Sequence, residues 1–400
     1  MHVIRFFIVI IFYSHLLITS LSAVTNSQKK AVMLASALAA IAYKSHRIMR
    51  TQKVLEPSVE NLNILLITPE GKSLDVTQGQ RISKIINKIE KNDIHEGDLV
   101  TINRSKDPSL AVISKNLIVS NSSNDLFLYA RGNSDRTFPA LDNLMGSNGT
   151  PRIGGGILEA YKYIKERIIN GVCVTFDFPD LRQTVSFGQE NEIACLRAVY
   201  QEVIKNNPDK KINYVAFCRG GTAGLDFATE HPKNLATLTL ESPLISFDVA
   251  THFFQKSYLY SIPYSGAFMY NVIRYLFPAY QPKADNLLER VEKIPKDMPI
   301  IIGHLRTDAV VSDSIIHQLM QKLKDHKNVY LVVVNDTTKK LFHGQLNSAK
   351  VFSQACNAFY AINNATHNEQ YAQEGMSLLE IAHANAHLSP EEWIMVDHKP

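Results

Sequence analysis

The sequence predicts an α/β fold in which helices flank both faces of a mostly parallel, doubly wound sheet. From about residue 125 onward, short apolar runs rich in β-branched and aromatic residues alternate with longer stretches of helical periodicity. One of these runs, Ile212–Phe217, stops at Cys218 and gives way at once to Gly- and Ala-rich sequence that is typical of a helix start. In a sheet of this kind, the residues that follow the strands meet at the carboxyl edge, where we expect the chemistry.

The length and composition fit such a fold. The chain has 400 residues, of which 45% are hydrophobic and 20% charged, enough for one large domain with appendages or for two smaller domains. A formal net charge of +4 is too small to indicate nucleic-acid binding. The four cysteines have neither zinc-binding spacing nor the density of a disulfide scaffold. We therefore expect free thiols, no metal, no cofactor and no nucleic-acid partner.

Residues 1–23 carry the features of a targeting segment. Arg5 precedes a long apolar run that ends among small residues, which resembles a cleavable secretory signal. Lys29 and Lys30 follow the run, and because basic flanks resist translocation, an uncleaved membrane anchor is the alternative. We therefore expect either export, as a secreted or periplasmic protein, or membrane association through the N-terminus.

Residues 24–124 are expected to form an N-terminal helix and added strands. Leu62–Thr68, Leu99–Ile102 and Leu110–Val119 read as strands, and isoleucine spacing makes Gln78–Lys91 helical. The strands could open the main sheet or form a separate β-rich layer, and the sequence is compatible with both.

Residues 125–362 form the predicted core. Residues 245–290 interrupt it with a Tyr- and Phe-rich helical insertion, which is either a lid over a pocket or plain packing. Residues 363–400 form a C-terminal tail that carries a possible docking helix. The core strands are expected at 126–130, 171–178, 212–217, 235–240, 299–305 and 329–334, and the helices at 157–169, 190–206, 221–229 and 348–362.

Cys218 stands at the centre of a small-x-nucleophile-x-small pattern, Ala216-Phe217-Cys218-Arg219-Gly220. Small residues two before and two after the central one leave room for a sharp strand-to-helix turn that holds one side chain in a strained conformation. At the helix N-terminus, the dipole then favours a thiolate or an oxyanion. Two interpretations are open: a nucleophile elbow with cysteine in place of serine, and a tight turn that carries a buried cysteine.

Asp308 and His343 each follow a predicted strand, so both are expected at the same edge as Cys218. A histidine beside a thiol can act as its base, and an acid behind the histidine fixes the imidazole tautomer. Glu241 and Asp336 also lie at strand ends and are alternative acids, although we favour Asp308. His304 lies inside an apolar strand and is expected to be a core residue.

Attack on a carbonyl produces an oxyanion, which needs hydrogen-bond donors. The backbone N–H of Arg219 and one from the turn Gly132-Asn133 are expected to supply them. The side chains of Arg131 and Arg219 could hold an anionic group of a substrate, or could lie in solvent as arginines commonly do.

With the nucleophile, the acid and the histidine in this order, residues 126–362 resemble the α/β-hydrolase family. AFCRGG resembles the family's elbow, GHLRTDAVV the loop with the acid and FHG the loop with the histidine, while FDFPD is similar to the segment that closes the second βαβ step. Most members carry serine, and cysteine looks like the dienelactone-hydrolase-like or polyester-synthase-like branch.

The resemblance implies the α/β-hydrolase fold with a helical lid. It implies a hydrolase that acts on an ester, thioester or amide of a small molecule or peptide through a Cys218-His343-Asp308 triad and an acyl-enzyme. The alternatives are an acyltransferase and a hydrolase fold without turnover that serves as a binding protein.

Overall fold

The computed structural model describes residues 64–67, 99–101, 125–130, 173–176, 178, 186, 188–245, 287–308, 310–337, 341, 343, 346 and 349–398. Among these residues, no helix has the length and apolar character needed to cross a membrane. Several predicted segments lie outside the described residues: 1–23, 78–91, 110–119, the turn Gly132-Asn133, 157–169 and nearly all of the insertion 245–290.

A nine-stranded sheet in the order β2-β1-β4-β3-β5-β6-β7-β8-β9 forms the centre of the described structure. All pairings from β4 across to β9 are parallel, so the predicted fold class is confirmed. The strands are β1 (Ile64–Ile67), β2 (Leu99–Thr101), β3 (Asp125–Ala130), β4 (Cys173–Phe176), β5 (Lys211–Phe217), β6 (Leu235–Glu241), β7 (Ile300–Leu305), β8 (Val329–Asn335) and β9 (Val396–Asp397).

The first two strands decide a question that the sequence left open. β1 pairs antiparallel with both β2 and β4, so these strands extend one edge of the main sheet and do not form a separate layer. The other predicted strands match the observed ones to within two residues at each end.

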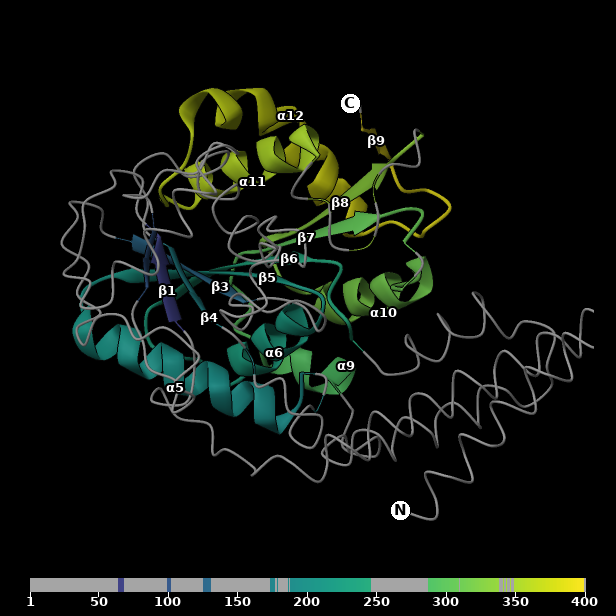
Figure 1. Ribbon diagram of the computed structural model, residues 1–400. Helices are drawn as coiled ribbons and strands as arrows, with labels where there is room; N and C mark the ends of the chain where they lie inside the picture. The colour runs from purple at the N-terminus through teal and green to yellow at the C-terminus, as the bar shows by residue number, and fades with distance from the viewer. Residues whose placement is uncertain are drawn as a thin grey trace, which may run out of the picture.

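Helices cover both faces of the sheet (Figure 1). α5 (Glu190–Asn206), α6 (Arg219–Ala228), α9 (Leu287–Arg290) and α10 (Asp313–Leu323) lie on one face, with the short 3-10 helix η7 (Val291–Lys293) after α9. α11 (Lys350–Ile362) and α12 (Glu369–Asn385) lie on the other. Alternate residues of the central strands therefore enter two separate cores: in β3, Leu126 and Leu128 face the first layer, and Phe127 and Tyr129 the second.

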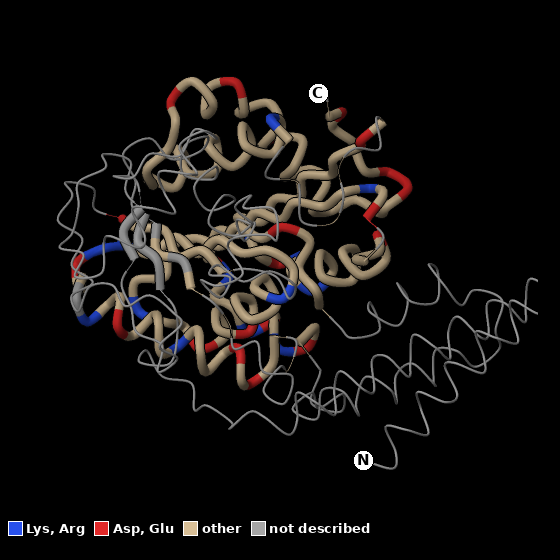
Figure 2. Tube along the Cα trace, viewed as in Figure 1, with Lys and Arg blue, Asp and Glu red and all other residues tan. Residues whose placement is uncertain are grey.

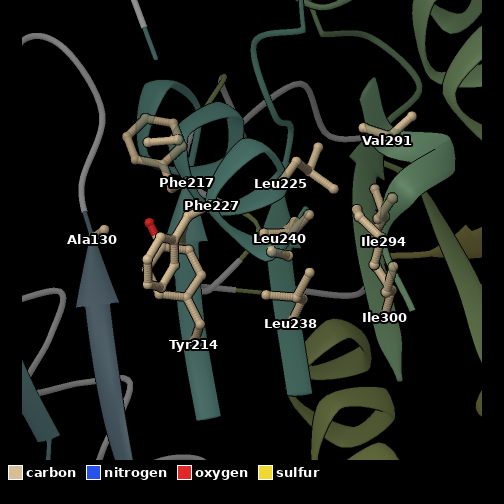
Figure 3. Close-up of a cluster of buried hydrophobic side chains, with 14 of the residues drawn as sticks. Ala130, Tyr214, Phe217, Leu225, Phe227, Leu238, Leu240, Val291, Ile294 and Ile300 are labelled. Carbon is tan, nitrogen blue, oxygen red and sulfur yellow. The ribbon is translucent and has the colours of Figure 1, made fainter. Parts of the chain in front are cut away.

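The contact between β5 and α6 is unusually close. A side chain on Gly224 would collide with the ring of Tyr214, so only glycine allows the helix to lie so near the strand. The Tyr214 hydroxyl donates to the carbonyl of Gly220 at 2.7 Å. Figure 3 shows Leu225 and Phe227 of α6 against the apolar side chains of β5 and β6. This packing fixes the start of α6, where the sequence places Cys218.

The C-terminal segment is built into the sheet. α12 packs against α11 and β8, and β9 pairs in parallel with β8. Thr366 donates from its backbone N–H and its hydroxyl to the buried carboxylate of Asp125, at 2.8 and 2.6 Å. The predicted tail therefore contributes a helix, a strand and buried hydrogen bonds to the fold.

Charged residues of both signs alternate over the described surface, as Figure 2 shows along α5. Arg197, for example, pairs with Glu190 and Glu230. Mixed charge of this kind is typical of a solvated protein surface.

Candidate active site

Cys218 occupies a strained turn between β5 and α6. Its backbone has φ 53° and ψ −117°, a conformation that L residues rarely adopt and that costs about 1–3 kcal/mol. Neighbouring backbone holds it there: the Cys218 N–H donates to Glu241 O at 2.9 Å, and Leu244 N–H donates to Cys218 O at 3.1 Å. Gly221 has to be small, because an added Cβ would come within 2.9 Å of Pro243. The backbone is thus that of the sharp strand-to-helix turn that the sequence predicted.

His343 and Asp308 form a hydrogen-bonded pair at the same edge of the sheet. The distance from Nδ1 of His343 to Oδ2 of Asp308 is 2.8 Å. The other carboxylate oxygen, Oδ1, accepts the backbone N–H groups of Val310 at 2.7 Å and Val311 at 3.0 Å. Since an ionised carboxylate can only accept, Nδ1 of His343 carries a proton and Nε2 is the nitrogen left to act as a base.

The thiol of Cys218 lies near the imidazole of His343, close enough to raise the pKa of the ring. Nε2 is buried and makes no hydrogen bond within the described residues. Hydrogen bonds of this kind are often long or poorly aligned in proteins without a bound ligand. The ring of Phe217 lies beside His343, with the ring centroids 5.3 Å apart.

The surroundings of the pair shift both pKa values. Burial lowers the pKa of His343, but the hydrogen bond to Asp308, followed by the interaction with Cys218, outweighs burial and raises it to about 10. Burial raises the pKa of Asp308, but the hydrogen bonds from His343, Val311 and Val310 outweigh it and hold the pKa below its ordinary value. An ionised acid behind a strongly basic imidazole is the arrangement needed to take a proton from a thiol.

The two alternative acids do not reach His343 and have other partners. Glu241 accepts the backbone N–H of Leu346 at 2.7 Å, and Asp336 accepts that of Leu341 at 2.6 Å. Both carboxylates are buried, and they bind the chain on either side of His343. The structure therefore brings together the favoured set, Cys218, His343 and Asp308. The other two acids hold the backbone on either side of His343.

The expectation that the side chain of Arg219 could lie in solvent is wrong. The residue is 2% exposed, so its guanidinium is buried inside the protein. It pairs at 3.0 Å with Glu192 of α5 and lies over the ring of Phe178, 4.9 Å from the centroid. The physical reason is that a buried carboxylate needs a charged partner, and Arg219 is the one that the fold supplies.

Sequence analysis also missed Glu192. A signal was available, because Glu192 shares a helical face with Cys195, Leu196 and Val199, at the spacings i+3, i+4 and i+7. All four residues are fully buried. An acidic residue on the apolar face of a helix calls for a buried partner.

The structure describes only one of the two expected donors to the oxyanion. The backbone N–H of Arg219 lies in the first turn of α6, where N–H groups have no carbonyl partner inside a helix. Gly132, Asn133 and Arg131 lie outside the described residues. Among the residues that are described, no group of three or more His, Cys, Asp or Glu side chains could hold a metal ion.

The sheet and its edge define the class of fold. The turn at Cys218 lies between β5 and α6, Asp308 follows β7, and His343 follows β8 and is hydrogen-bonded to Asp308. A parallel sheet with these three groups in this chain order has the α/β-hydrolase fold.

Solved structures with similar folds include esterases and a peptidase. The Pyrococcus furiosus esterase Pf2001 is 17% identical with a TM-score of 0.41, covering 66% of this chain and 85% of the esterase. Est1E from Butyrivibrio proteoclasticus is 14% identical with a TM-score of 0.41, covering 61% and 90%. A Pyrococcus horikoshii acylaminoacyl peptidase is 14% identical with a TM-score of 0.37, covering 64% and 39%.

No protein-family model and no curated protein matches the chain in sequence. Structural similarity at such low identities and scores says nothing about activity. The fold class rests on this chain's own strand order and elbow.

Proposed function

We propose that the protein is a hydrolase that cleaves an ester, thioester or amide through the triad Cys218, His343 and Asp308. The observation that carries the proposal is the position of the His343 ring, which is hydrogen-bonded to a buried carboxylate and lies near enough to the elbow cysteine for Cys218 to raise its pKa. The cysteine supports chemistry of the dienelactone-hydrolase-like or polyester-synthase-like branch. The substrate is a small molecule or peptide with a reactive carbonyl group.

The first half of the reaction forms an acyl-enzyme. His343 takes the thiol proton through Nε2, and the sulfur of Cys218 attacks the carbonyl carbon, so that a C–S bond forms and the carbonyl π electrons move to oxygen. As the tetrahedral intermediate collapses, the bond to the leaving group breaks and the imidazolium donates its proton to the departing oxygen, sulfur or nitrogen. Asp308 stays ionised and keeps the ring oriented.

The second half releases the acyl group. His343 deprotonates a water molecule, whose oxygen attacks the carbonyl carbon of the thioester. The C–S bond then breaks, the imidazolium returns the proton to the sulfur of Cys218, and the carboxylic acid product leaves. In both halves the oxyanion is received by the backbone N–H of Arg219 and by one from the Gly132-Asn133 turn. Loss of one such donor costs about 3 kcal/mol of transition-state stabilisation.

One observation favours a second candidate, a binding protein without turnover. Cys218 is only 6% exposed, so a substrate carbonyl has little access to the sulfur in this conformation. An acyltransferase is a variant of the main proposal, in which another nucleophile replaces water in the second half.

A labelling experiment separates the two candidates. A thiol-directed probe is reacted with the wild type, Cys218→Ala, Cys218→Ser and His343→Ala. We expect labelling at Cys218 that is lost in both His343→Ala and Cys218→Ala. Labelling that is indifferent to His343→Ala supports the binding protein. A hydrolysis screen across acyl lengths, with and without an added alcohol or amine acceptor, then distinguishes hydrolysis from acyl transfer.

We further propose that residues 1–23 direct the protein to export or tether it to a membrane, on the basis of their apolar run and small C-terminal residues. Mass spectrometry of the N-terminus after cell fractionation tests this. A soluble exported protein lacking residues 1–23 indicates a signal peptide, and an intact membrane-bound one indicates an anchor. An intact protein confined to the soluble cytosol contradicts both.

A further inference from the structure

We propose that Glu192 and the side chain of Arg219 are positioning residues, which set the first turn of α6 so that the backbone N–H of Arg219 faces the developing oxyanion. The proposal rests on the proposed function and adds to it a buried support for the turn at Cys218. Neither side chain touches the substrate.

The carboxylate of Glu192 gathers several groups around the start of α6. It accepts the backbone N–H of Ser186 at 3.0 and 3.1 Å, the Ser186 hydroxyl, and the backbone N–H of Gly188 at 3.2 Å. It also pairs with Nη2 of Arg219 at 3.0 Å, with side chains 1% and 3% exposed. One buried carboxylate thus joins the segment before α5 to the residue that follows the nucleophile.

The segment that Glu192 holds lies directly against α6. Gly188 has φ +91°, and a Cβ there would collide with the side chain of Thr222, so glycine is required for the approach. On the opposite side, Gly221 leaves just enough room for Pro243. The first turn of α6 is therefore in close contact with the chain at two places, Gly188 and Pro243. The Glu192–Arg219 pair holds the contact at Gly188.

A buried ion pair is better suited to fixing geometry than to adding stability. Desolvation of the two charges offsets most of their attraction, so apolar residues of similar size often stabilise a fold as well. The fixed geometry matters at an oxyanion site, because a misplacement of about 1 Å can slow catalysis on the order of 100-fold. We therefore expect the pair to affect carbonyl chemistry more than folding.

Two reactions at the same sulfur test the proposal. Acylation by a p-nitrophenyl ester passes through an oxyanion, whereas alkylation by iodoacetamide displaces iodide from carbon and forms no oxyanion. Both need an accessible, deprotonated Cys218. In Glu192→Gln and Arg219→Met, we expect acylation to slow about 100-fold while alkylation stays within about threefold of the wild type. Arg219→Lys, which keeps the charge, should recover part of the acylation rate.

A matched control is available on the same helix. Arg197 of α5 pairs with Glu230, just after α6, at 2.6 Å, but these side chains are 34% and 37% exposed. We expect Arg197→Met and Glu230→Gln to leave both rates unchanged. The double variant Glu192→Gln/Arg219→Met should lose less than the product of the two single losses, since both act through one contact.

The possible outcomes are distinct. If the variants lose alkylation and acylation in parallel, or lose neither, the pair has no positioning role and the proposal is wrong. If the wild type is acylated and the variants are acylated equally fast, only the positioning role is overturned. If the wild type is alkylated but never acylated by the ester, the proposed function fails, and this proposal fails with it.

Discussion

Two histidine–carboxylate pairs lie near the end of β7, and their contacts differ. In the first, His343 Nδ1 lies 2.8 Å from Asp308; in the second, His304 Nε2 lies 2.7 Å from Asp313. The side chain of His343 is 15% exposed, and nearby Cys218 raises its pKa. His304 is fully buried, and its second nitrogen has no hydrogen-bond partner in the described part of the chain. Its ring makes an edge contact with that of Trp393.

The two carboxylates also differ in what else they bind. Asp313 pairs with Arg306 at 2.8 Å, so much of its charge is already neutralised. Within the described residues, the second oxygen of Asp308 accepts only backbone N–H groups, from Val310 and Val311, and no arginine or lysine competes with His343 for its charge. The difference lies in the surroundings of each pair: a histidine–carboxylate pair can activate a thiol only where the thiol is near the imidazole. The second pair consists of the same two residue types, histidine and aspartate. Its contacts with Arg306 and Trp393 give it a structural setting.

The largest expected effect comes from removing the base of the first pair. His343→Ala should lower kcat about 10⁴-fold, because the thiol loses its proton acceptor. The change should also lower the melting temperature at neutral pH, because the raised pKa of His343 means that its proton stabilises the folded state. Steady-state kinetics on an activated ester and a melting curve measure the two quantities. A variant that keeps its kcat would place the base elsewhere.

Next in size is the acid. Asp308→Asn should lower kcat about 10³-fold and lower the pKa of His343, because the hydrogen bond to Asp308 is the largest interaction that raises it. Titration of the His343 imidazole by NMR, assigned with His343→Gln, measures the pKa. Asp313→Asn is the matched control and should leave that pKa unchanged. Equal shifts in both variants would contradict a specific Asp308 effect.

The second pair should respond in stability and not in rate. His304→Ala leaves a cavity next to Trp393 and removes a hydrogen bond, so we expect a loss of about 3 kcal/mol in the free energy of unfolding. Among molecules that stay folded, kcat should remain within about threefold of the wild type. Urea unfolding and kinetics below the transition measure both. A large fall in kcat with unchanged stability would give His304 a functional role.

The smallest effect is a pH dependence of stability that comes from the first pair. The pKa of His343 is raised in the folded protein from 6.5 to about 10, so the folded state binds more protons than the unfolded state between these values. The stability from this site should therefore be complete below pH 6.5 and fall as the pH rises towards 10. Urea unfolding of the wild type and His343→Gln measures it, and parallel pH curves for the two proteins would refute the shift.

The sequence predicted best those parts of the site that neighbouring residues encode. The turn at Cys218 is visible in five consecutive residues, and its strained φ of 53° agrees with the pattern of small neighbours. The sequence gives less support to the choice of Asp308 over Glu241 and Asp336, because all three residues lie at the ends of strands. Only the folded chain shows that Glu241 and Asp336 bind backbone N–H groups on either side of His343.

By itself, the sequence determined the alternation of strands and helices, the position of the elbow and the order of nucleophile, acid and histidine, because these follow from periodicity and from neighbours along the chain. The tertiary structure alone decided which carboxylate meets His343, which charge neutralises Glu192, and that β1, β2 and β9 join the main sheet. The physical reason is that these contacts join residues far apart in the sequence. Asp308 and His343 are 35 residues apart in sequence and 2.8 Å apart in space, and such a contact depends on how whole strands pack, which no local pattern encodes.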